Sequence, residues 1–316
     1  MIKRIIVVVF AVFVCVVAIG AEDVSIGGVY DIQYRKGDSY KATGGDKFDV
    51  SALYLTVMKN LDKNIDSKLI IDGADLASET ATTPSHKYVE EAQIIIRNIA
   101  ELPLTVVFGK DEMPFGQDYD KSLFDPLVHS LEIDKVWGLN AGYKFNDMFK
   151  LEAAVWEQAG NTDIGISENY TTRLSVNPLD NLFVKLSFAN IEQLAAKDES
   201  RISAGLVYNL PAIVLYGEYV GFDNPVTTLG GYAMGDNPTL SCIGVDVPIT
   251  DIWKIKARYE SVDDDINTDT LSGVFHTGVD YAIGKNTTLM LEYQNILGEG
   301  SVQDVRDISV GIIASF

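Results

Sequence analysis

The sequence of 316 residues contains little cysteine, proline or histidine, and few basic residues for its acidic content. There are 2 cysteines, 9 prolines and 3 histidines, and 25 Lys and Arg residues stand against 45 Asp and Glu residues, for a formal net charge of −20. Two cysteines are too few for a disulfide scaffold. The acidic excess argues against a nucleic-acid partner, because affinity for phosphate requires a basic surface. Since 47% of the residues are hydrophobic, intrinsic disorder is excluded as well.

Long hydrophobic runs are also scarce. There is one, at residues 5–19, directly after Lys3 and Arg4. A basic start, a short apolar run and small residues behind it are typical of a secretory signal peptide. We therefore expect residues 1–21 to be a cleaved leader and residues 22–316 to form one domain. The run is shorter than the ~20 residues that a spanning helix requires, which argues against a retained anchor. No later stretch approaches that length, so any membrane-spanning part must consist of strands.

After the leader, hydrophobic and polar residues alternate. Ile26, Tyr30 and Ile32, for example, fall on one side of an extended chain, whereas Asp31 and Gln33 fall on the other. Alternation of this kind has the period of a β-strand with one apolar face. It predicts sixteen strands. They span residues 24–35, 48–60, 65–74, 87–98, 103–110, 136–145, 149–158, 168–177, 182–190, 200–209, 213–222, 239–247, 253–261, 271–283, 288–297 and 306–316.

The connections between these strands alternate in length. Even-numbered strands are followed by tight turns such as 61–64 and 284–287, and odd-numbered strands by longer polar loops such as 75–86 and 223–238. Short turns at one rim, long loops at the other and an even strand number are typical of bacterial outer-membrane barrels. A soluble sandwich or propeller would not sort its connections in this way. The pattern thus predicts an all-β, transmembrane antiparallel barrel in the outer membrane, surrounded by outer-membrane lipids, with short periplasmic turns and long extracellular loops.

If the apolar face contacts lipid, side chains of the opposite parity face the interior. A barrel of about sixteen strands is too wide for side chains to fill, so polar inward residues would line an aqueous channel. Ion pairs that brace the wall are the alternative role for these residues, and the two roles are compatible. The predicted pore-wall bases are Lys68, Arg97, Arg173, Lys185, Lys254, Lys256 and Arg258.

The third long connection, from Gly109 to Lys135, is longer than the others and is both acidic and apolar. Its hydrophobic residues, such as Phe115 and Phe124, would be poorly solvated outside the barrel, so we expect the loop to fold against the inner wall. An acidic loop opposite a basic wall would set up a transverse field across a narrowed pore. The candidate constriction acids are Asp111, Glu112, Asp118, Asp120, Asp125, Glu132 and Asp134.

Short motifs in and before this loop resemble the LbtU-type siderophore porins. The resemblance covers about thirty residues, including the strand end 107–110 and Leu131-Glu132, and the sixteen strands with a third-loop constriction are similar to the wider porin superfamily. It implies passive or facilitated uptake across an outer membrane without an energy-coupling plug. The residues that carry it best are Gly109, Lys110, Pro114, Phe115, Gly116, Asp125, Pro126 and Leu127.

Signals for other chemistry are weak. His86, His129 and His276 lack the spacing of zinc ligands. The pairs His129 with Ser130 and His276 with Asp280 lack a nucleophile elbow or a paired carboxylate, so we expect no enzyme and no cofactor.

An acidic segment before residue 270 resembles the start of a calcium loop. It lacks the turn glycine and the closing Glu, whose places are taken by Thr268 and Val274. The alternative is an acidic surface loop. The weak calcium candidates are Asp263, Asp265, Asn267 and Asp269.

Together these observations predict an outer-membrane porin through which small hydrophilic solutes or ions diffuse passively. Two alternatives stay open: a substrate-selective porin for ferric siderophores, and a structural or adhesive barrel with a closed lumen. A homotrimer and a monomer are both compatible with the sequence.

Overall fold

The computed structural model describes residues 24–41, 46–73, 89–118, 122–157, 169–192, 198–224, 228–229, 232–233, 237–263, 271–298 and 304–316. The expected leader, residues 1–21, lies outside these ranges. Among the described residues, no helix is long and apolar enough to cross a membrane.

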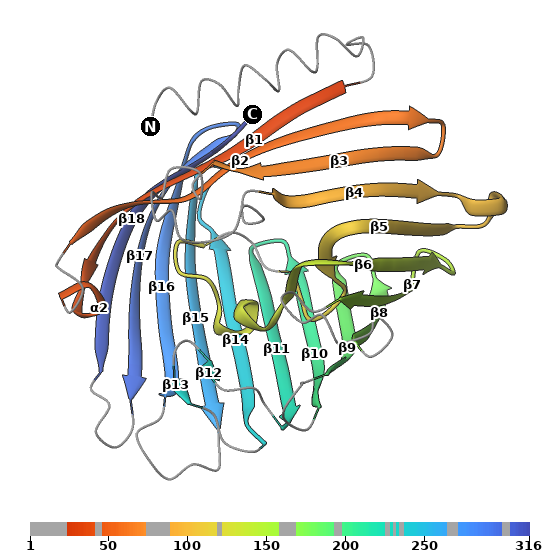
Figure 1. Ribbon diagram of the computed structural model, residues 1–316. Helices are drawn as coiled ribbons and strands as arrows, with labels where there is room; N and C mark the ends of the chain where they lie inside the picture. Colours follow the sequence, from red (N-terminus) through yellow and green to blue (C-terminus); the bar gives the residue numbers. More distant parts are fainter. Residues whose placement is uncertain are drawn as a thin grey trace, which may run out of the picture.

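Sixteen antiparallel strands form a closed barrel (Figure 1). The strands are β1 (Val24–Gly37), β2 (Lys47–Asp62), β3 (Ile65–Asp72), β4 (Val89–Arg97), β5 (Leu104–Met113), β6 (Ile133–Lys144), β7 (Phe149–Glu157), β8 (Asn169–Leu179), β9 (Leu182–Ile191), β10 (Glu199–Leu210), β11 (Ile213–Asp223), β14 (Thr239–Pro248), β15 (Trp253–Asp263), β16 (Leu271–Gly284), β17 (Thr287–Gly298) and β18 (Val305–Ser315). The short elements are α2 (Asp38–Lys41), η2 (Ile99–Glu101), η3 (Leu127–Leu131) and the paired strands β12 (Thr228–Leu229) and β13 (Tyr232–Ala233). The predicted fold class is confirmed.

The barrel closes where β1 pairs with β18. Their register aligns Tyr30 with Ala314, and the backbones of Gly28 and Phe316 exchange two hydrogen bonds of 3.1 Å. The ring of Phe316 stacks on Tyr30 with centroids 5.5 Å apart. Closure removes the open sheet edge, which is the condition for strands to cross a bilayer with every backbone group satisfied.

The two faces of the wall follow the predicted parity. On β10, Ile202 and Leu206 point outward and are 54% and 45% exposed, whereas the intervening Ser203 is 3% exposed. β15 repeats the pattern, with Ile255 and Tyr259 exposed outside. Apolar residues outward and polar residues inward are what a membrane barrel requires, because the outer face meets hydrocarbon and the lumen meets water.

One predicted boundary is wrong, because β5 and β6 extend beyond the expected ends of their strands. Lys110 pairs with Trp137 and Met113 with Ile133, with an irregularity between Asp111 and Met113. The connection is therefore residues 114–132 and not 109–135, and the predicted loop acids Asp111, Glu112 and Asp134 belong to strands. Consecutive charged residues and the β-bulge hide the two-residue alternation, which is why the sequence pattern missed these strand ends.

Candidate functional site

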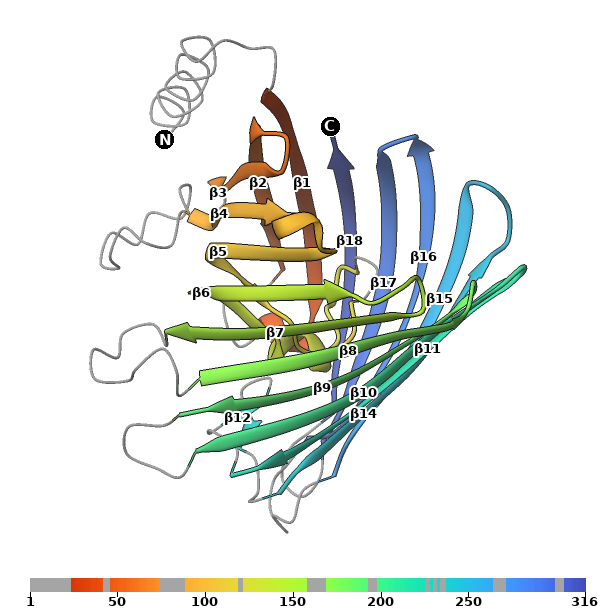
Figure 2. The ribbon, with the colours of Figure 1, turned by 90° about the vertical axis from the view of Figure 1, so that its right-hand side faces the viewer.

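Residues 114–132 are here called the lumenal loop. Its described parts, 114–118 and 122–132, run inside the ring of strands (Figures 1 and 2). The start of the loop is fixed to the wall by side chains. Thr171 Oγ1 on β8 donates a 2.8 Å hydrogen bond to the carbonyl of Pro114, and the Gly116 N–H donates one of 3.1 Å to Ser187 Oγ on β9. These contacts confirm the expectation that the third long connection folds into the lumen.

The middle of the lumenal loop is held by the carboxylate of Glu292 on β17, which is 1% exposed. One carboxylate oxygen accepts hydrogen bonds from the Leu123 N–H at 2.8 Å, the Phe124 N–H at 3.1 Å and Ser122 Oγ at 3.0 Å. The other oxygen accepts from Lys256 Nζ at 2.7 Å. A charge-assisted acceptor of this kind is stronger than a neutral one, so Glu292 fixes both the loop backbone and a buried ammonium.

Glu260 on β15 has the same role further along the loop. Its carboxylate accepts from the Leu127 N–H at 2.6 Å and from Arg258 Nε at 2.9 Å. Arg258 also donates through its Nη2 to the carbonyl of Phe124 at 2.9 Å. We call Glu260 and Glu292 the carboxylate latch, because together they satisfy backbone N–H groups that would otherwise be buried without a partner.

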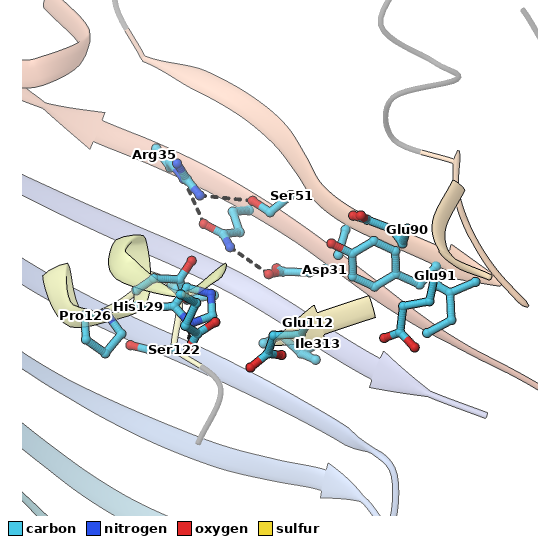
Figure 3. A pocket seen from close by; sticks show the side chains of 17 residues that line it. Asp31, Arg35, Ser51, Glu90, Glu91, Glu112, Ser122, Pro126, His129 and Ile313 are labelled. Carbon is cyan, nitrogen blue, oxygen red and sulfur yellow. Dashed lines mark hydrogen bonds and ion pairs between the residues drawn. The ribbon is translucent and has the colours of Figure 1, made fainter. Parts of the chain in front are cut away.

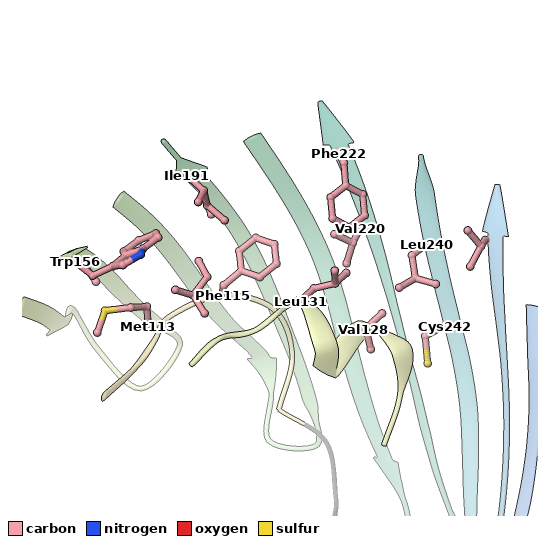
Figure 4. Packing of buried hydrophobic residues seen from close by; sticks show 14 of the residues in the cluster. Met113, Phe115, Val128, Leu131, Trp156, Ile191, Val220, Phe222, Leu240 and Cys242 are labelled. Carbon is pink, nitrogen blue, oxygen red and sulfur yellow. The ribbon is translucent and has the colours of Figure 1, made fainter. Parts of the chain in front are cut away.

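Apolar side chains of the loop region pack on inward-facing apolar residues of the wall (Figure 4). Phe115, Val128 and Leu131 are between 3% and 7% exposed in this packing. Burial of apolar area stabilises by about 25 cal/mol per Å², so this cluster supports the crossing that the latch fixes. The wall residues in the cluster include Trp156, Ile191, Val220, Phe222, Leu240 and Cys242.

All seven predicted pore-wall bases are described, and each lies within ion-pair distance of a carboxylate. Lys256 contacts Asp280 at 2.8 Å as well as Glu292, and Arg173 contacts Glu152 at 3.0 Å. These are the ion pairs expected of bases that brace the wall, and lining the channel stays a compatible prediction for the same residues. The other pairs are Lys68 with Glu91, Arg97 with Asp66, Lys185 with Asp118, Lys254 with Asp246 and Arg258 with Glu260.

Of the predicted constriction acids, the structure places Asp118 against basic side chains. It pairs with Arg173 at 3.4 Å and with Lys185. Burial works to raise the pKa of Asp118, but the hydrogen bond and charge of Lys185 outweigh burial and hold that pKa below its usual range. Asp111 instead accepts a 2.7 Å hydrogen bond from Gln93 Nε2 on the neighbouring strand. Asp120 lies outside the described residues.

The lumenal loop separates two cavities in the described region of the barrel. The larger, of about 500 Å³, lies between the loop and β1–β5, and six of its 17 lining residues are acidic (Figure 3). The smaller, of about 380 Å³, lies toward β9–β16. Ser122 lines both cavities. Charged and titratable residues of the larger cavity are Asp31, Arg35, Glu90, Glu91, Glu112, Asp125, His129 and Glu132, and those of the smaller are Asp118, Lys185, Asp246, Lys256, Arg258 and His276.

Three acids of the larger cavity, Asp31, Glu90 and Glu91, were not among the predicted site residues. Asp31 faces inward by simple parity, but Glu90 does so because the β3–β4 register shifts between Ile70 and Ile71. The adjacent acids Glu90 and Glu91 were the available signal. In a regular strand one of them would face lipid, which is unfavourable, so a bulge could have been inferred.

The family-motif residues act mainly through the backbone. Gly109, on β5, has φ +138°, and a Cβ there would lie 2.0 Å from the carbonyl oxygen of Ala92. Gly116 has φ +70° at the start of the lumenal loop. Lys110 lies on β5 and donates to the Val89 carbonyl. Pro114 and Phe115 are buried in the loop start, and Asp125, Pro126 and Leu127 lead into η3.

The two described histidines, His129 and His276, have acidic partners. His276 Nε2 lies 3.0 Å from Glu292, and its ring meets Phe124 edge-on at 5.8 Å. Among the described residues no group of three metal-ligating side chains could hold a metal ion. Of the calcium candidates, Asp263 ends β15, and Asp265, Asn267 and Asp269 lie outside the described residues, as does His86.

His129 is expected to titrate far above ordinary histidines. Its Nδ1 lies 2.8 Å from Glu132, and this hydrogen bond, against the effect of burial, raises the pKa of His129 to about 9. The unfolded value is ~6.5, so the stabilisation from this pair is complete below pH ~6.5 and is lost as pH rises through about 9. Histidine NMR across pH 5–10 should show this midpoint. Glu132→Gln should lower it toward the unfolded value, and an unchanged midpoint in that variant would contradict the assignment.

A sequence comparison identifies the family. The profile described as Gram-negative porin matches residues 113–301, more than half of the chain. The chain belongs to the Gram-negative porin family. It is therefore an outer-membrane porin, and its location is the bacterial outer membrane. The sequence matches none of the curated proteins with which it was compared.

Solved structures of outer-membrane proteins share the fold. OmpT of Vibrio cholerae lacking loop L8 superposes with a TM-score of 0.67 at 13% identity, over 93% of this chain and 99% of that one. A trimer form of V. cholerae OmpT gives a TM-score of 0.64 at 11% identity, over 93% and 99% of the two chains. The anion-selective porin from Comamonas acidovorans gives a TM-score of 0.64 at 13% identity, over 93% and 99%. At these identities the likeness concerns the fold alone.

Proposed function

We propose that this porin lets small hydrophilic solutes or ions diffuse passively through a water-filled lumen that the lumenal loop narrows. The observation that carries the proposal is the loop crossing itself, which leaves a cavity of about 500 Å³ with carboxylates in its lining beside it. A volume of about 300–1,000 Å³ is typical of small-molecule sites. In this proposal Asp118, Asp125 and Glu132 of the loop narrow the pore, and the paired wall bases keep its shape.

Planar-bilayer recording tests the proposal directly. Purified, refolded barrel should give discrete single-channel current steps, and liposomes containing it should swell in small sugars and amino acids. Folding is verified separately by the difference in gel migration between heated and unheated samples. Folded protein that gives no current steps and no swelling would refute passive diffusion and favour the structural or adhesive barrel with a closed lumen.

A second candidate, uptake of ferric siderophores, is supported by the resemblance of residues 107–132 to LbtU-type porins. Under this candidate, liposomes should take up a ferric chelate faster than an uncharged sugar of similar mass. Equal or slower uptake of the chelate would leave general diffusion as the function.

We further propose that the protein acts without catalysis and assembles as a homotrimer. The porin family supports the first point, and the trimer form of a structural neighbour supports the second. Light scattering of the detergent-solubilised protein would measure its oligomeric state. N-terminal sequencing of the exported protein would test the proposed removal of residues 1–21 by showing whether it starts at Glu22.

A further inference from the structure

We propose that the larger cavity is the conducting path and that it selects small cations over anions. The inference rests on the proposed diffusion function and names its permeant class. It departs from the expected pairing of an acidic loop with a basic wall.

The acids of the larger cavity come from both of its sides. Asp31 on β1 and Glu90 and Glu91 on β4 belong to the barrel wall (Figure 3). Asp125 and Glu132 belong to the lumenal loop. A solute that passes between loop and wall therefore meets carboxylates on both sides. Because low-dielectric walls focus the field of like charges, such a passage concentrates cations and excludes anions.

The lining has two basic groups, and each is hydrogen-bonded or ion-paired to a neighbouring side chain. Among the described residues that line the cavity, the bases are Arg35 and His129. Arg35 donates to Gln33 at 2.8 Å and to Ser51 at 3.0 Å, and His129 is paired with Glu132. Six carboxylates thus stand against two basic groups.

The described backbone of the lumenal loop around residues 123–127 also offers no free N–H groups to an anion at the three positions that follow. Backbone N–H groups can bind anions, but those of Leu123, Phe124 and Leu127 already donate to the carboxylate latch. Behind the latch, Lys256 and Arg258 of the smaller cavity are buried and ion-paired with the same two acids. The basic half of the lumen therefore offers an anion no equivalent path.

Reversal potentials across a KCl gradient test the inference. The wild type should show a K⁺/Cl⁻ permeability ratio on the order of 10, since charged clefts raise local counter-ion concentration by roughly 10-fold or more. The double variant Glu112→Gln/Asp125→Asn, at two exposed positions of the lining, should lower the ratio several-fold, and Glu90→Gln should lower it from the wall side. The matched control Asp251→Asn removes an acid from the exposed β14–β15 turn and should leave the ratio unchanged.

Salt supplies an independent measurement. The Debye length falls from about 10 Å at 0.1 M to about 3 Å at 1 M, so the permeability ratio should decline toward 1 at high salt. Current steps with a ratio at or below 1 in the wild type would overturn the inference and leave the proposed diffusion function intact. A ratio that Glu112→Gln/Asp125→Asn and Glu90→Gln both leave unchanged would also overturn it. Folded protein without current steps would instead refute the proposed function.

Discussion

Replacing Glu292 by alanine is expected to cause a large loss of stability. The change removes the acceptor of the Leu123 and Phe124 N–H groups and leaves Lys256 with Asp280 as its remaining acidic partner in the described lumen. Breaking a buried ion pair by removing one partner costs about 3–5 kcal/mol, and buried N–H groups left without acceptors add to it. We expect the free energy of unfolding in lipid vesicles, measured by urea titration of tryptophan fluorescence, to fall by about that amount.

Function should change with stability in the same variant. With its central anchor removed, the lumenal loop should fluctuate, and single-channel current should become noisy where the wild type gives steady steps. Glu292→Gln is the matched control, because it keeps the shape and one acceptor oxygen but removes the charge. The free energy of unfolding of Glu292→Gln should lie between those of the wild type and of the alanine variant. An alanine variant within about 1 kcal/mol of the wild type, with steady current, would show that the latch does not hold the loop.

Gly109→Ala is expected to block assembly of the barrel. The φ of +138° at this position is a conformation that side chains rarely adopt, and the added Cβ would lie 2.0 Å from the carbonyl oxygen of Ala92 on β4. The clash is with the backbone of a paired residue, and Gly109 lies one position from the end of the β4–β5 ladder, so relief requires breaking the register there. We expect a destabilisation of at least about 4 kcal/mol, in the range of exceptional mutations, seen as little or no heat-modifiable barrel in refolding assays.

Gly142→Ala provides the control for this substitution. Gly142 also faces the lumen, on β6, but its Cβ would come no closer than 3.4 Å to the flexible side chain of Lys150. It should refold nearly as well as the wild type. If Gly109→Ala refolds to the same yield as Gly142→Ala, the backbone role assigned to this motif glycine is wrong.

The barrel wall could be predicted because its information is local. In a strand, neighbouring side chains point to opposite faces. A strand with one face toward lipid and the other toward water therefore has alternating apolar and polar residues in its sequence. Ile202 and Leu206 outward with Ser203 inward are one instance. The prediction failed where the regular alternation is interrupted, at the β5 and β6 ends and at Glu90. A bulge inserts one residue into a strand, so the residues beyond it face the opposite side from the one that the alternation predicts.

The site could be predicted only in outline. An apolar, acidic connection too hydrophobic for solvent had to turn inward, and residues 114–132 do so. Its anchors could not be found in this way, because Glu260 and Leu127 are 133 residues apart and Glu292 and Leu123 are 169 residues apart. No local pattern relates such pairs.

By itself the sequence determined the strands, their number and the inward course of the third connection. It also determined the face that side chains take wherever the alternation is unbroken. These features follow from short-range alternation and from the cost of exposing apolar side chains. Only the tertiary structure decided how the charges are distributed. It pairs the wall bases with carboxylates, uses Glu260 and Glu292 to hold the loop, and collects Asp31, Glu90 and Asp125 around one cavity. Charge interactions depend on distance through space, and that distance is set by the closure of the barrel and the crossing of the loop.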